Sequence, residues 1–287
     1  MMSMIECTNL SNNSLKSLDF FLEEGRVLGL LGKNGAGKTT LLSVLMGVLE
    51  KSPYADVKVL GHEPGCWPEP LKSQIGYVPQ RFWGFDALSI RESINTIKPF
   101  YQHWDDALAT ELINEFDLPE HQQIKTLSEG QKQLTSIVLA MSFRPKLLVL
   151  DEPVASLDPL SRRQFLEKLI ENHCDHGTSV IFSTHITSDL ERIASDVLIL
   201  KDGKALITGD IESVRESVVR VKFNFPENKK LTFDGLSVLS SGHHREQYQL
   251  LVDQGGQNIK QLLADKGATN IQIEHINLDD LFLELHS

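Results

Sequence analysis

The chain has 287 residues, of which 41% are hydrophobic and 23% are charged, which suits one or two folded domains and excludes a disordered chain. No apolar run approaches the ~18 residues that a membrane-spanning helix needs, so an integral membrane protein is excluded, but not a protein that works at a membrane. The net charge of −11 argues against nucleic acid as a partner and against direct docking on anionic lipid.

The N-terminus and the cysteines favour a reducing cytoplasm. The first ten residues lack the basic and apolar regions of a secretory signal. Cys7, Cys66 and Cys174 are odd in number and widely spaced. A disulfide framework or a zinc site is therefore not expected.

Five short apolar runs are typical of buried parallel strands. They are Val27–Leu31, Ile75–Pro79, Leu147–Leu150, Ser179–Ser183 and Val197–Leu200. Helical stretches lie between them, and alternating strands and helices predict an α/β layered domain.

Several of these helices have recognisable first turns. Ser89–Glu92 and Ser128–Gln131 each fit a capping box. Asp158 precedes Pro159, which is the order of an N-cap acid and a first-turn proline. Lys201–Lys204, between two apolar runs, predicts a hairpin turn.

The pattern changes near residue 212, so we predict one domain over residues 1–212 and a small α+β accessory domain over residues 213–287. No catalytic motif is found in the second domain. Its expected helices, the first of which straddles the boundary, are Ile211–Ser217, Asn258–Lys266 and Leu278–His286, and its expected strands are Val219–Phe225, Lys230–Phe233, Gln247–Val252 and Ile271–His275.

The most specific motif is a phosphate-binding loop that follows the strand Val27–Leu31. It fits G-x-x-x-x-G-K-[ST] and opens the helical run after it. Its glycines let backbone N–H groups point at phosphate oxygens, Lys38 reaches the β- and γ-phosphates, and the Thr39 hydroxyl ligates Mg²⁺. The predicted nucleotide-binding residues of the loop are Gly32, Lys33, Asn34, Gly35, Ala36, Gly37, Lys38, Thr39 and Thr40.

The second motif is an apolar strand that ends in two acids, Asp151 and Glu152. Carboxylates at the edge of a core are costly unless something compensates them. Magnesium offers that compensation: Asp151 holds its coordination shell, and Glu152 serves as the general base toward the attacking water.

Together with three further segments, these motifs make the chain resemble the ATP-binding subunit of an ABC transporter. Leu127–Gln131, with the sequence LSEGQ, resembles the signature LSGGQ of that family. Gln80 matches its glutamine loop and His185 its switch histidine, and Ser156–Asp158 matches the loop after the acidic strand. The resemblance covers residues 1 to about 210 and implies a P-loop NTPase fold of the ABC type with a helical subdomain at about residues 81–135.

The resemblance implies ATP and Mg²⁺ as ligands and a head-to-tail dimer, either homodimeric or heterodimeric. ATP bound at Lys38 is closed over by Ser128, Gly130 and Gln131 of the other subunit. His185 is a catalytic residue that contacts the γ-phosphate. Gln80 joins Thr39 and Asp151 around the metal.

Two positions depart from the family pattern. Glu129 stands where the family usually has glycine, and we expect its carboxylate to point away from a partner's triphosphate. The segment Leu10–Leu18 contains no aromatic ring to stack on adenine, so affinity is expected to rest more on the phosphates.

The resemblance also implies a partner: an integral membrane permease that the chain contacts through its helical subdomain, from the cytoplasmic face of the membrane. Three aromatics in Arg81–Phe85 are either an exposed anchor for that partner or part of the subdomain core. Phe100–Asp105 and Leu278–Phe282 resemble a bacterial export-type subgroup with a separate membrane subunit. The alternative is a non-transport ABC ATPase that acts in signalling, immunity, translation or DNA repair.

Overall fold

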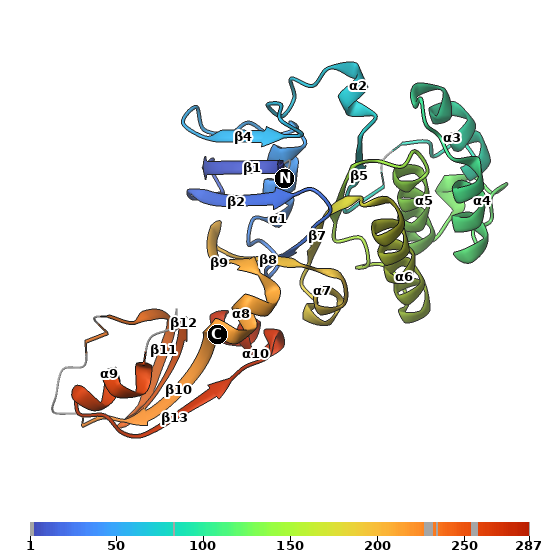
Figure 1. The fold of residues 1–287 in the computed structure, drawn as a ribbon. Helices are drawn as coiled ribbons and strands as arrows, with labels where there is room; N and C mark the ends of the chain where they lie inside the picture. The colour runs from blue at the N-terminus through green and yellow to red at the C-terminus, as the bar shows by residue number, and fades with distance from the viewer. Residues whose placement is uncertain (1–2, 83, 227–231, 234, 254–257, 287) are drawn as a thin grey trace. The chain divides into compact units, whose positions relative to one another are not determined.

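The computed structural model describes residues 3–82, 84–226, 232–233, 235–253 and 258–286, and these fall into two compact units, Met1–Ala205 and Leu206–Ser287. The domain boundary predicted after residue 212 lies inside helix α8 (Ile211–Ser217). Each unit is described by itself (Figure 1).

The first unit alternates strands and helices, and the mixed α/β fold predicted from the sequence is confirmed. Its last strand continues into the second unit. In chain order the elements are β1 (Ser3–Leu10), β2 (Leu18–Glu23), β3 (Val27–Leu31), α1 (Lys38–Leu45), β4 (Asp56–Val59), α2 (Glu69–Lys72), β5 (Ile75–Val78), α3 (Ile90–Ile97), η1 (Lys98–Phe100), α4 (Asp106–Glu115), η2 (Ile124–Thr126), α5 (Glu129–Met141), β6 (Leu147–Asp151), α6 (Pro159–His176), β7 (Ser179–Thr184), α7 (Thr187–Ile193), β8 (Asp196–Lys201) and β9 (Lys204–Asp210).

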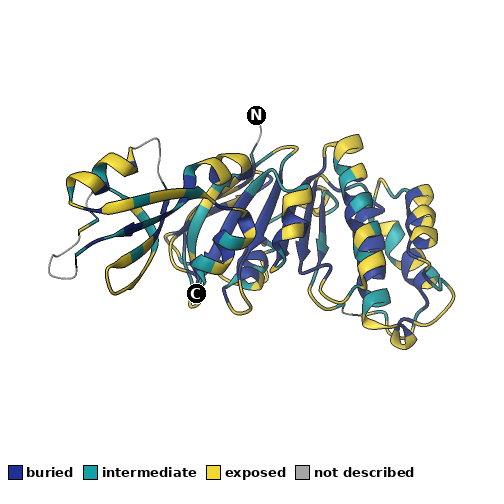
Figure 2. Ribbon diagram, turned by 90° about the horizontal axis from the view of Figure 1, so that it is seen from below, coloured by how far each residue is buried: buried dark blue, intermediate teal, exposed yellow. Residues whose placement is uncertain are grey.

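The central sheet has the strand order β5-β6-β7-β3-β8-β9, and its strands from β5 to β8 run parallel. Strands β3, β6 and β7 are buried along their whole length, as their uninterrupted apolar runs predict (Figure 2). Leu31 pairs with Thr184 and Asp151 with Ser183, so the carboxyl ends of β3, β6 and β7 meet at one edge. Ligands of open α/β sheets bind at such an edge.

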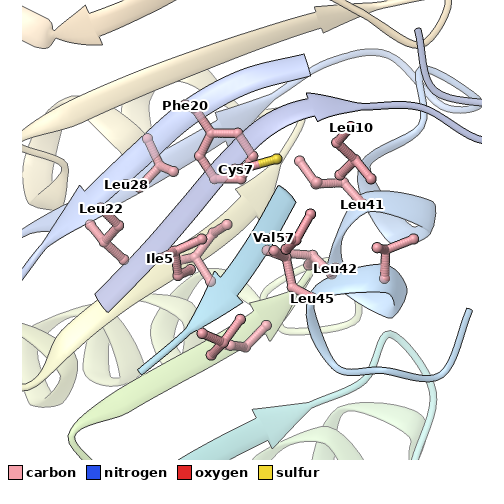
Figure 3. Packing of buried hydrophobic residues seen from close by; sticks show 14 of the residues in the cluster. Ile5, Cys7, Leu10, Phe20, Leu22, Leu28, Leu41, Leu42, Leu45 and Val57 are labelled. Atoms are coloured by element: carbon pink, nitrogen blue, oxygen red, sulfur yellow. The ribbon is translucent and has the colours of Figure 1, made fainter. Parts of the chain in front are cut away.

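A second sheet of the first unit, with the antiparallel order β2-β1-β4, was not among the predicted elements. Its inward side chains, Ile5 and Cys7 of β1 and Phe20 of β2 among them, pack with Leu41 and Leu42 of α1 (Figure 3). Helix α1 is therefore buried by apolar contacts, and this fixes the phosphate-binding loop at its N-terminus.

The capping predictions are confirmed. Ser89 caps α3 and Ser128 caps α5, each with a complete capping box, and Asp158 caps α6 in front of Pro159. The segment predicted as a helical subdomain, about residues 81–135, contains α3, η1, α4, η2 and the first half of α5. Its apolar side chains share one core with strands of the central sheet.

The second unit is built on the antiparallel sheet β11-β12-β10-β13. Helix α9 packs on one face of it through Ile259 and Leu263. Its elements after α8 are β10 (Val218–Asn224), β11 (Ser237–His244), β12 (Gln247–Asp253), α9 (Ile259–Asp265), β13 (Thr269–His275) and α10 (Leu278–Leu285).

One predicted strand of this unit was wrong in its described part. Of Lys230–Phe233, the first two residues lie outside the described residues, and Thr232 and Phe233 are not in a strand. The strand that pairs with β12 comes later, at β11, where polar and exposed residues hide the pattern. None of the described helices combines the length and the apolar composition that crossing a membrane requires.

Candidate functional site

The phosphate-binding loop joins β3 to α1 in a conformation that its glycines make possible. Gly35 and Gly37 have φ angles of 81° and 110°, which residues with a side chain rarely adopt, and Gly37 is the N-cap of α1. A Cβ atom on Gly32 would lie 2.9 Å from the Leu200 carbonyl oxygen. The loop thus curls tightly and presents the free N–H groups of a helix start, which is an anion site.

Lys38 is buried below this loop. Its Nζ donates a hydrogen bond of 2.6 Å to the Gly32 carbonyl oxygen and lies 3.4 Å from that of Lys33. Only 6% of its side chain is exposed, so its charge needs a partner. Lys33, Asn34, Gly35 and Thr39 are exposed, whereas Gly32 and Ala36 are buried and Gly37 and Thr40 are half-buried.

Asp151, at the end of β6, is fully buried and meets Thr39 and Ser183. The Ser183 hydroxyl donates to Asp151 Oδ1 at 2.8 Å, while Oδ2 has no hydrogen-bond partner in the described part of the chain. Burial raises the pKa of Asp151, and hydrogen bonds from Ser183 and Thr39 oppose that rise. The unpaired Oδ2 of Asp151 and the hydroxyl of Thr39 are oxygen ligands of the kind that Mg²⁺ prefers.

Glu152 connects Lys38 with His185. Its Oε1 lies 3.0 Å from Lys38 Nζ, and its Oε2 lies 2.9 Å from His185 Nδ1. The Lys38 contact is an ion pair without hydrogen-bond geometry, so Oε1 has no hydrogen-bond partner among the described residues. A carboxylate only accepts, so the His185 hydrogen bond to Glu152 Oε2 has its proton on Nδ1.

The backbone at Glu152 is held in a conformation that costs of order 1–3 kcal/mol for a residue with a side chain. Its φ angle is +48°. Its N–H donates to Ser183 Oγ at 2.8 Å, and its carbonyl accepts from the Ala155 N–H at 3.1 Å. Ser183 thus supports both acids. Sequence reasoning missed it, although a serine inside an apolar strand is a usable signal.

Gln80 follows β5 and is exposed, and its side chain makes no hydrogen bond to the cluster within the described residues. Its neighbour Pro79 accepts a hydrogen bond of 3.3 Å from Nε2 of Gln133, which is buried in α5. The structure therefore brings Lys38, Thr39, Asp151, Glu152 and His185 together, but not Gln80.

The signature segment contains the N-cap and the first turn of α5. Among the described residues, no hydrogen bond or ion pair joins its side chains to the cluster. Ser128 and Gln131 bond one another's backbone N–H groups at 3.2 and 3.0 Å. Glu129 is exposed and pairs with Lys132 at 2.8 Å, which holds the pKa of Glu129 below its usual value. A Cβ atom on Gly130 would lie 2.9 Å from the Ser156 carbonyl oxygen, so glycine is needed here for packing within the chain.

The structure describes two of the three aromatic residues that follow Gln80. Phe82 and Phe85 are half-buried and pack against the core, which favours the subdomain-core interpretation; Trp83 lies outside the described residues. Phe82 also lines a cavity of about 270 Å³. The other lining residues are Ile75, Tyr77, Pro79, Ile97, Tyr101, Ser136, Leu139, Ala140 and Phe143.

Comparisons with known proteins agree with this geometry. The family model described as ABC transporter matches residues 15–155. The ABC transporter ATP-binding protein YtrB of Bacillus subtilis (strain 168) is 26% identical over 98% of this chain and 97% of its own length. The ABC-type transporter ATP-binding protein EcsA of the same organism is 30% identical over 71% of this chain and 84% of its own length.

A solved structure of an ATP-binding subunit of an ABC transporter superposes with a TM-score of 0.67. It is 27% identical and covers 74% of this chain and 92% of its own. A phosphate-binding loop, two acids and a histidine at one sheet edge are the parts that ATP hydrolysis needs. The chain therefore belongs to the ATP-binding proteins of the ABC transporters, a family of ATPases.

Proposed function

We propose that this chain powers export through a separate integral membrane subunit, on the cytoplasmic face of the membrane, by ATP-driven head-to-tail dimerisation. The contacts of Glu152 with Lys38 and His185 are the observation that carries the proposal for hydrolysis. Export is supported by the segments Phe100–Asp105 and Leu278–Phe282, which resemble an export-type subgroup.

Each residue of the cluster has a distinct task in hydrolysis. Lys38 binds the β- and γ-phosphates and, in doing so, exchanges the Glu152 carboxylate for phosphate oxygens. Glu152 then accepts a proton from the attacking water, and His185, which contacts Glu152, lies where it can bond the γ-phosphate. Thr39 and Asp151, together with Gln80, would hold Mg²⁺, which would neutralise the charge that develops on the phosphates.

The dimer supplies what this cluster lacks. Ser128 is exposed at the N-cap of α5, where free backbone N–H groups favour an anion. Ser128, Gly130 and Gln131 of one subunit would close over the ATP held at Lys38 of the other. Glu129 is paired with Lys132, so its charge is partly offset near that triphosphate.

The cavity lined by Phe82 is our candidate for the docking of a membrane subunit. Tyr77 and Tyr101 provide aromatic walls, and Tyr101 stacks on Phe143 with ring centroids 4.0 Å apart. Burial and then the charge of Asp151 raise the pKa of Tyr77 to about 12, so the Tyr77 hydroxyl stays neutral in this cavity. A partner helix seated here would touch a strand that neighbours β6.

Purification of the tagged full-length chain from membranes tests this proposal. We expect the wild-type chain to carry along an integral membrane protein that stimulates its ATPase activity. Phe82→Asp should lose that protein and keep ATP affinity, whereas Phe21→Asp, at an exposed residue of β2 outside the cavity, should keep both. Equal recovery of the membrane protein with both variants would contradict docking at the cavity.

A further inference from the structure

Two chain segments carry the residues that meet at the catalytic cluster. One runs from Glu152 to Arg162, through the cap of α6. The other runs from His185 to Asp189, into the first turn of α7. Glu152 and His185 touch at the start of these segments, at 2.9 Å, and Arg162 and Asp189 touch at their ends.

The contact between Arg162 and Asp189 is an ion pair between a half-buried arginine, 27% exposed, and a buried aspartate. Arg162 Nε donates to Asp189 Oδ1 at 2.8 Å, and Nη2 donates to the same oxygen. The Asp189 side chain is 4% exposed, and its Oδ2 has no hydrogen-bond partner among the described residues. Arg162 therefore supplies the main compensation for a buried carboxylate, and such a pair is strongly destabilised when one member is removed.

Both segments are otherwise tied to the body of the unit. Leu190, next to Asp189, is fully buried against Gly29 of β3. A side chain at position 29 would collide with Leu190, because a Cβ atom there would lie 2.0 Å from Leu190 Cδ2. Asp158 caps α6 one turn before Arg162. The turn between Glu152 and Asp158 is closed by hydrogen bonds from Ala155 to Glu152 and from Leu157 to Val154.

The geometry points to Arg162 and Asp189 as positioning residues for the catalytic contact. The two segments and the two side-chain contacts together form a closed ring. The backbone connects Glu152 to Arg162 and His185 to Asp189, and the side-chain contacts Arg162–Asp189 and Glu152–His185 close the ring at its two ends. The ion pair fixes the separation of the two segments and so sets where the His185 ring stands relative to the Glu152 carboxylate. Sequence reasoning missed both residues, because an arginine and an aspartate 27 positions apart form no motif.

This inference rests on the proposed roles of Glu152 and His185. A displacement of about 1 Å in a catalytic constellation costs on the order of 100-fold in rate. Asp189→Asn keeps the shape of the side chain and removes its charge. We expect it to lower kcat by about 10- to 100-fold and to change the dissociation constant for ATP by less than about threefold.

Asp105→Asn is the matched control. Asp105 bonds Arg144 Nε and Nη2 at 3.0 and 2.8 Å, in an ion pair of the same unit that does not touch the cluster. The Asp105→Asn variant should have a lower melting temperature than the wild-type chain. Its kcat, measured well below that temperature, should be unchanged. Arg162→Met is a second test variant, and Arg162→Lys should recover most of the activity that Arg162→Met loses.

Two readouts separate positioning from a general loss of stability. In a His185→Ala background, Asp189→Asn should lower kcat by no more than about twofold, because the contact it positions is already gone. The ring signals of His185 in a proton–carbon NMR spectrum, assigned by their absence in His185→Ala, should shift in Asp189→Asn and stay in place in Asp105→Asn.

Unmoved His185 signals in both Asp189→Asn and Arg162→Met would overturn the inference, whatever happens to hydrolysis. An equal loss of kcat with and without His185 would overturn it as well. A wild-type chain that hydrolyses no ATP would instead refute the proposed function, and the NMR comparison would still decide whether the pair positions His185.

Discussion

The two units bury different kinds of side chain. Every buried polar or charged residue in the described part of the chain belongs to the first unit and lies within residues 38–189. The second unit has an apolar core around Val219, Val221 and Leu250, and none of its described charged side chains is fully buried. Arg220, for example, is 18% exposed and pairs with Glu284, itself 17% exposed.

This difference locates the chemistry. A buried lysine, two buried acids and the buried Asp189 with its half-buried partner Arg162 cost free energy that apolar packing would not, so their presence in one unit indicates a functional site. The second unit is held together by apolar packing and partly exposed ion pairs. We therefore expect changes in the first unit to alter activity, and comparable changes in the second to alter stability slightly.

The largest expected effect comes from Lys38→Ala. The change removes the charge that holds the phosphates and leaves the Glu152 carboxylate without its ion-pair partner. We expect ATP affinity to fall by at least about 100-fold, because the phosphates lose a charge-assisted hydrogen bond worth about 1.5–3 kcal/mol and the attraction of the lysine charge. Calorimetric titration measures this directly, with Lys58→Ala, at an exposed residue of β4 outside the loop, as the control. Unchanged ATP affinity in Lys38→Ala would contradict the assignment.

A smaller effect is expected from Gly130→Ala. In an open helix turn this change gains up to about 1 kcal/mol, but here the added Cβ meets the Ser156 carbonyl. We expect the free energy of unfolding to fall by about 1–3 kcal/mol. Gly242→Ala in β11, where nothing lies within 4 Å, should change it by no more than about 0.5 kcal/mol. Denaturant titration of both variants measures these free energies. Equal changes in the free energy of unfolding for Gly130→Ala and Gly242→Ala would contradict the expectation.

The smallest effect is expected in the second unit, from Glu274→Gln. A hydrogen bond from Lys222 holds the pKa of Glu274 below its ordinary value of 4.5. A lowered carboxyl pKa contributes stability above the ordinary value and loses it as the pH falls through the folded value. Glu274→Gln should therefore lower the melting temperature slightly at neutral pH and not at all in strong acid. A shift that persists in acid would show that the ion pair is not its cause.

Patterns within a few residues were sufficient to predict much of the first unit. The strand Val27–Leu31 and the caps Ser89, Ser128 and Asp158 were predicted because burial and capping leave local signatures. The sheet β2-β1-β4 was missed although β2 and β4 alternate between buried and exposed residues, because β4 has only four residues and β1, the central strand, alternates irregularly. Strand β11 was missed because it is polar and exposed.

The site was predictable as a set of motifs but not as a set of contacts. The ion pair between Lys38 and Glu152 depends on the order of β6, β7 and β3 in the sheet, which no local pattern encodes. The packing of Gly130 on Ser156 likewise joins the first turn of α5 to the loop between β6 and α6. Such contacts arise from the tertiary arrangement, and so do Ser183, Arg162 and Asp189 as supporting residues.

Single-turnover hydrolysis by Glu152→Gln, with protein in excess over ATP, tests the central claim most directly. Glutamine keeps the size of Glu152 and cannot accept a proton, so we expect ATP to bind with at least wild-type affinity. Loss of a general base lowers a rate by about 10²–10⁴-fold, and we expect a loss of that size here. Hydrolysis near the wild-type rate would show that Glu152 is not the base and that its contacts with Lys38 and His185 serve the structure alone.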